Sequence, residues 1–138
     1  MPRNAESDWG EWAMARCAIA FALEAEVQDA ADGDDLLWSL DPGSALEAME
    51  RLGDALAAAL RDIAERPPPA ALSTLHDALV RYLTWRVRLN DSMVVAAEAG
   101  GWAGAQTVYQ SDVAAGLPLF RAFQGELDAL RPPGGNQR

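Results

Sequence analysis

Residues 72–130 decide the fold of this chain, and they read LSTLHDALVRYLTWRVRLNDSMVVAAEAGGWAGAQTVYQSDVAAGLPLFRAFQGELDAL. Apolar side chains recur at three- and four-residue steps on both sides of a turn at Ala99-Gly100-Gly101-Trp102. Side chains at that spacing share one face of an α-helix, so the pattern predicts two amphipathic helices folded back on each other. The first stripe consists of Leu72, Leu75, Leu79, Leu83, Arg86, Asn90, Met93, Val94 and Ala97, and the second of Trp102, Tyr109, Val113, Gly116, Phe120, Phe123 and Leu127.

Two polar residues, Arg86 and Asn90, stand in the first stripe where leucine is expected. A hairpin that turns at the two glycines places Asn90 opposite residues 111–112 and Arg86 opposite residues 115–116. Asp112 is then the natural partner of both, and we expect these three residues to form a buried network. Gly116 leaves room for the arginine at this level of the hairpin. Pro118 lacks the backbone N–H that a helix interior needs, and it is expected to kink the last helix.

Two further helices are predicted ahead of the hairpin. Asp8 and Glu11 match a capping box that would begin a helix running from Trp9 to about Ala31. Its stripe consists of Trp9, Trp12, Arg16, Ile19, Ala20, Leu23, Val27 and Ala30, which places an arginine on an apolar face. The next helix is expected from Pro42 to about Glu65, with a stripe of Met49, Leu52, Leu56, Leu60 and Ile63.

The connections between these helices are short. Residues 34–40 are apolar enough that we expect a short helical connector covering one end of the core. Pro67-Pro68-Pro69 ends the preceding helix and forms a stiff spacer. The elements together predict an all-α protein, an antiparallel four-helix bundle. Residues 1–131 would form this single domain and residues 132–138 a disordered tail. The alternative is two hairpins, hinged at the prolines, that pair with a second chain as a homodimer.

Composition and charge exclude several classes of function. The chain has 138 residues, half of them apolar, and a formal net charge of −10 without a single lysine. Nucleic-acid binding needs clustered basic side chains, so general affinity for nucleic acid is not expected. No apolar run approaches the roughly 20 residues of a membrane span, and the N-terminal residues lack a signal-peptide pattern. Cys17 is the only cysteine, which favours a reducing compartment, and we expect a cytoplasmic protein.

The sequence contains no pattern of catalytic or metal-binding residues. One histidine and one cysteine cannot supply the usual nitrogen and sulfur ligands of a metal site. His76 has Ser73 three positions before it, where carboxylate di-iron bundles carry glutamate. The glycine-rich phosphate loops and the Gly-x-Ser-x-Gly turn of hydrolases are also absent. We therefore expect no enzyme activity, metal or cofactor, and we place His76 at the flank of the bundle.

Two groups of residues are candidate sites. The first is an interior polar set that forms either a structural network or, as the alternative, a pocket in which two arginines hold an anion. It consists of Arg16, Arg86, Asn90, Tyr109 and Asp112. The second is an outer face on which a tryptophan lies between arginines, the composition of a hot spot in protein interfaces. It consists of Arg81, Trp85, Arg88 and Ser92. The tryptophan could equally cover the flank of the neighbouring helix.

These features favour a non-enzymatic helical interaction module, an adaptor or a subunit of a larger complex, that docks on a protein partner. One alternative is a small acidic inhibitor or immunity-type protein that binds a basic enzyme. The other is a bundle that binds a small anionic ligand through Arg16 and Arg86. Binding driven by acidic faces would weaken steeply with ionic strength, whereas tryptophan-centred docking would not.

The turn sequence Trp102-Ala103-Gly104 resembles the Trp-x-Gly turn of the small helical-hairpin proteins exported by type VII secretion. The resemblance covers residues 72–131 and implies a helical hairpin there. The chain departs from that family in carrying two predicted helices ahead of the hairpin. It also lacks the family's export signal, a tyrosine followed four residues later by an acid, because Tyr109 is followed at that spacing by Val113. We make no family assignment from this turn.

Overall fold

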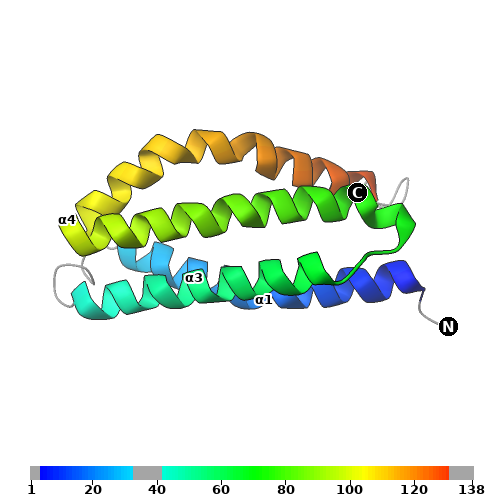
Figure 1. Cartoon of the computed structure of the whole chain (residues 1–138), viewed down its shortest axis with the longest axis horizontal. Helices are drawn as coiled ribbons and strands as arrows, with labels where there is room; N and C mark the ends of the chain where they lie inside the picture. Colours follow the sequence, from blue (N-terminus) through cyan, green and yellow to red (C-terminus); the bar gives the residue numbers. More distant parts are fainter. Residues whose placement is uncertain (1–3, 33–41, 131–138) are drawn as a thin grey trace.

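The computed structural model describes residues 4–32 and 42–130, and the regular elements in these residues are all helices. They are α1 (Ala5–Asp32), α3 (Pro42–Glu65), the short 3-10 helix η1 (Ala70–Leu72) and α4 (Ser73–Ala129), shown in Figure 1. The all-α prediction is confirmed. The predicted connector at 34–40 and the tail at 132–138 lie outside the described residues.

The long helix α4 is interrupted at two glycines. Gly100 has φ −138° and ψ 17°, and Gly101 has φ 65° and ψ −157°, a combination that only glycine adopts readily. Figure 1 shows α4 turning back on itself, so we call residues 73–99 its first arm and residues 102–129 its second arm. The described residues thus contain three α-helices, and the predicted count of four separate helices is not confirmed.

The two arms approach closely just after the turn. A Cβ atom added to Gly104 would lie 2.5 Å from the carbonyl oxygen of Ala96, so only a residue without a side chain fits there. Farther along, α4 continues through Pro118 with helical backbone angles. Figure 1 shows the second arm as a bow rather than a straight helix, and no break in the helical backbone angles marks the bend expected at Pro118.

The helix that begins the fold starts earlier than predicted. The side-chain oxygen of Asn4 accepts a hydrogen bond from the backbone N–H of Ser7 at 2.7 Å, the geometry of an N-terminal cap. Asp8, expected as the cap, lies inside α1. By contrast, α3 has the predicted bounds.

The core forms where α3 packs against both α1 and α4. One buried cluster joins α1, α3 and α4 and includes Cys17, Leu56, Ile63 and Leu83. A second cluster, near the turn of α4, joins α3 to both arms and includes Met49, Leu89, Met93, Ala97 and Ala105.

The buried face of α1 differs from the predicted one. It carries Trp9, Ala13, Cys17 and Ala20, whereas Ile19 is 63% exposed. Arg16, expected on the apolar face, is exposed and forms a 3.8 Å ion pair with Asp62 of α3. The small side chains Ala13, Cys17 and Ala20 suit the close packing of α1 against α3, which larger residues at these positions would disturb.

Candidate functional site: an apolar groove between α1 and the second arm of α4

Two pockets lie between α1 and the second arm of α4, with the first arm of α4 as their floor. Asn4 and the first ten residues of α1 lie opposite residues 123–130 at one pocket, and Glu24 lies opposite residues 109–120 at the other. We call these two pockets together the groove.

The larger pocket lies at the N-terminal end of α1 and has a volume of about 530 Å³. Leu75 and Leu79 form its floor, with Met14 on the α1 side and Leu127 and Leu130 on the side of the second arm. The floor is buried, whereas Met14 and Leu130 are 51% and 49% exposed. The pocket is therefore open to solvent and walled by large apolar side chains.

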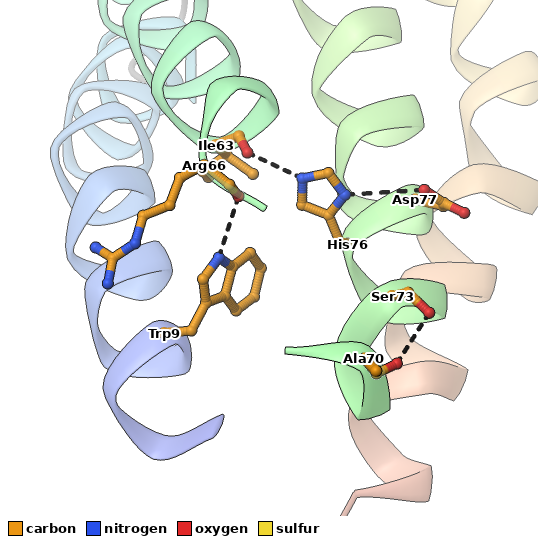
Figure 2. A network of polar contacts seen from close by, with 7 residues as sticks. All are labelled: Trp9, Ile63, Arg66, Ala70, Ser73, His76 and Asp77. Atoms are coloured by element: carbon orange, nitrogen blue, oxygen red, sulfur yellow. Dashed lines mark hydrogen bonds and ion pairs between the residues drawn. The ribbon is translucent and has the colours of Figure 1, made fainter. Parts of the chain in front are cut away.

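Trp9 is held in place at this end of the groove by polar contacts (Figure 2). Its indole Nε1 donates a 3.4 Å hydrogen bond to the carbonyl oxygen of Arg66, and its ring meets the edge of His76 at 5.8 Å between ring centroids. His76 in turn donates from Nε2 to the carbonyl oxygen of Ile63 at 2.9 Å. Through these contacts, His76 joins α4 to the end of α3 and to the start of α1. The Arg66 guanidinium also lies 4.4 Å from the centre of the Trp12 ring.

The smaller pocket is lined by aromatic side chains and has a volume of about 190 Å³. Tyr82 lies at its centre, with Phe120 at 5.4 Å and Trp85 at 6.1 Å between ring centroids. Tyr82 also stacks on Phe123 at 6.2 Å. Tyr109, predicted as part of an interior polar set, lines this pocket and is 42% exposed.

An ion pair between Arg86 and Glu24 crosses from the first arm of α4 to α1 at this pocket. The Arg86 side chain is 9% exposed and its Nε has no hydrogen-bond partner within the described part of the chain, whereas the Glu24 side chain is 37% exposed. The predicted pairing of Arg86 with Asp112 is therefore wrong, since Asp112 is exposed on the second arm. Glu24 follows Trp9, Ala13, Cys17 and Ala20 at steps of three and four residues, a spacing that marks it as part of the same face.

Asn90 faces a different helix from Arg86. Its Nδ2 donates a 3.0 Å hydrogen bond to the carbonyl oxygen of Met49 in α3. Gly53 provides the space, because a Cβ atom there would lie 2.7 Å from the same nitrogen. The expected shared network of Arg86 and Asn90 is thus two separate contacts, one toward α1 and one toward α3.

Trp85 points inward rather than onto an outer face. A Cβ atom on Gly116 would lie 2.2 Å from the Trp85 ring, so the glycine makes room for this tryptophan and not for the arginine that we expected. Arg81, Arg88 and Ser92, the other members of the predicted outer face, are exposed. Without its tryptophan, this face loses the feature that suggested a hot spot.

The helices that border the groove are mostly acidic. Within residues 5–25 and 102–130, the basic side chains are Arg16 and Arg121. The acidic ones are Glu6, Asp8, Glu11, Glu24, Asp112, Glu126 and Asp128. Seven acids against two arginines give these two stretches a net charge of −5, and a negative net charge favours cationic groups nearby.

Two buried side chains of the core, Cys17 and Tyr82, have shifted pKa values. Burial raises the pKa of Cys17 from 9.0 to about 11, so its thiol is protonated at neutral pH and is a poor nucleophile. Burial also raises the pKa of Tyr82, and the nearby Arg86 charge partly opposes this shift. Among residues 4–32 and 42–130, no three acidic, histidine or cysteine side chains gather as a metal site requires.

Comparison with known protein families, with curated proteins and with solved structures gives no match to this chain. In the part of the chain that the structure describes, no helix has the length and apolar character needed to cross a bilayer.

Proposed function

We propose that this chain is a non-enzymatic helical interaction module that binds a protein segment in the groove. The observation that carries the proposal is the row of large apolar side chains left exposed along it. Met14, Leu117, Phe120 and Leu130 are between 38% and 51% exposed, and all four line one of its two pockets. Apolar residues gathered around a concave surface are typical of protein-binding sites, because covering them removes apolar area from water.

We further propose that the two arms of α4 act as the third and fourth helices of an antiparallel bundle that is open on one side. Support comes from the packing of α3 against both α1 and α4, combined with the groove between α1 and the second arm. The proposed compartment is the cytoplasm, because a single buried cysteine suits a reducing environment.

An anion site shared by Arg16 and Arg86 is not part of this proposal. Arg16 is paired with Asp62 and Arg86 with Glu24, so each arginine already has a carboxylate partner. The two arginines also lie in different contacts, one between α1 and α3 and the other between α1 and α4.

Affinity purification from the host with the tagged full chain tests the proposal. Met14→Gln combined with Leu130→Gln removes apolar area from the groove while keeping helix-compatible side chains. Ile19→Gln is the matched control, since Ile19 is an exposed apolar residue of α1 that lines neither pocket. We expect a specific protein that is recovered with the wild type and the control and lost with the double variant. Equal recovery with the double variant would refute a role for the groove.

A further inference from the structure

We infer that the occupant of the groove is a single amphipathic helix of the partner, with one apolar face and basic flanks. This inference rests on the proposed function and specifies the chemistry of the segment that binds. Three observations carry it: the length of the groove, the helical nature of its walls and the sign of the charges around it.

The two pockets together extend over the length of a helix of ordinary size. The α1 side extends from Glu6 in the larger pocket to Glu24 in the smaller one. This separation of 18 residues corresponds to about 27 Å at 1.5 Å per helical residue. A partner helix of about 18 residues would span both pockets with apolar side chains at i, i+3, i+4 and i+7.

The walls and floor of the groove favour a helix over an extended segment. They belong to α1 and to the two arms of α4, whose backbone N–H and C=O groups are used within the helices themselves. An extended peptide lying in the groove would leave its own backbone groups without partners against apolar side chains. A helix satisfies its backbone internally and presents only side chains to the groove.

The charges select a basic partner and disfavour a second copy of this chain. Seven acids and two arginines occupy the described side chains of α1 and the second arm, and the whole chain carries −10. A second copy would bring another −10 to the same surface, and like charges brought together weaken association. Lysines or arginines along the flanks of a partner helix would instead lie next to the acidic residues that line the larger pocket, Glu6 and Glu11.

Designed peptides test this inference on the full chain. Three fluorescein-labelled 18-residue peptides are compared by fluorescence anisotropy: leucines on one helical face with lysines elsewhere, the same leucines with glutamates, and the lysine peptide in shuffled order. We expect the amphipathic lysine peptide to bind at least about tenfold more tightly than either other peptide, a difference of about 1.4 kcal/mol. Its affinity should fall with added salt, drop in the Met14→Gln, Leu130→Gln variant and persist in Ile19→Gln.

Three results would overturn the inference. Equal affinity of the lysine and glutamate peptides would remove the role of charge. Equal affinity of the ordered and shuffled lysine peptides would remove the role of the apolar face. Binding that is unchanged in the double variant would place the peptide outside the groove.

Sedimentation velocity of the chain alone tests the competing occupant. We expect a monomer at all concentrations, whereas a dimer that dissociates in the double variant would assign the groove to a second copy. Failure of the peptides is distinguishable from failure of the proposed function. A host protein that requires Met14 and Leu130 would still establish the groove as a binding site, with an occupant of different chemistry.

Discussion

The two arms of α4 are of similar length but are packed very differently. The first arm buries nine residues, whereas the second buries only Ala105, Gly116 and Phe123. The first arm contacts α3 through Asn90, α1 through Arg86 and the second arm through Trp85. The second arm rests mainly on the first, through Gly116 and the aromatic contacts of Tyr82.

This difference bears on the binding role that we propose for the groove. A helix surrounded by neighbours uses its apolar face to stabilise the fold. A helix that packs along one side leaves some of its apolar side chains exposed. In the second arm these are Leu117 and Phe120, and Leu130 follows directly after it. The comparison therefore assigns stability mainly to the first arm and the available binding surface mainly to the second.

The largest expected difference in the free energy of unfolding is between two leucine-to-alanine substitutions in α4. Leu83 is fully buried, and Leu83→Ala should lower the free energy of unfolding by about 2–5 kcal/mol. Leu117 is 45% exposed, and Leu117→Ala should change the free energy of unfolding by less than about 0.5 kcal/mol. Urea unfolding followed by circular dichroism measures both. Equal losses would mean that the second arm is packed as tightly as the first.

Removing Glu24 from the Arg86–Glu24 ion pair should cost more stability than removing Arg86. Glu24→Gln leaves the Arg86 charge, 9% exposed, without its carboxylate and should cost about 2–3 kcal/mol, less than for a fully buried pair because Glu24 reaches water. Arg86→Leu leaves a carboxylate that can be hydrated and should cost about 1 kcal/mol or less. Thermal unfolding of both variants and of Glu24→Leu, Arg86→Leu together checks this order. A larger loss for Arg86→Leu would contradict it.

Alanine substitutions at two glycines of the second arm should change stability by smaller amounts and in opposite directions. Gly116→Ala forces a methyl group against the Trp85 ring and should destabilise the protein by about 1–3 kcal/mol. Gly125→Ala meets nothing within 4 Å and should stabilise the helix by up to about 1 kcal/mol. Melting temperatures of the two variants give the answer. If both substitutions raised the melting temperature, Trp85 would not pack against Gly116 as described.

The smallest expected effect is a loss of stability in alkaline solution. The pKa of Cys17 is raised by burial from 9.0 to about 11, so between these values the folded state holds a proton that the unfolded state has lost. Stability is therefore retained below pH 9 and falls as pH rises, by about 1 kcal/mol between pH 8 and pH 10. Urea unfolding at the two pH values measures this loss, and Cys17→Ala should reduce it. An unchanged pH dependence in Cys17→Ala would show that other groups, such as Tyr82, cause it.

The parts of the fold that large residues determine could be predicted from the sequence. The bounds of α3 and its buried Met49, Leu52, Leu56 and Ile63 follow from regular spacing of bulky apolar residues. The turn of α4 follows from two adjacent glycines, of which Gly101 requires its positive φ. Each of these patterns lies within a short stretch of the sequence.

The residues of the candidate site could not be predicted from the sequence, because their exposure depends on contacts between residues far apart in the chain. The face of α1 was predicted correctly at Trp9 and Ala20 but not between them. The buried Ala13 and Cys17 are too small to mark the face, while the larger Ile19 is exposed. The inward position of Trp85 depends on Gly116, which lies 31 positions away on the other arm. The exposure of Met14, Leu117 and Leu130 depends on how far α1 and the second arm are separated, which no short stretch of sequence specifies.

The glycine turn at Gly100 and Gly101 also bears on local opening of the fold. An arm joined to the molecule through a flexible turn, and packed mainly along one side, can detach and reattach without unfolding of the remaining helices. Backbone amides of the second arm should therefore exchange with deuterium faster than those of the first arm. A helix bound in the groove would slow that exchange, so protection of residues 102–129 would report occupancy directly.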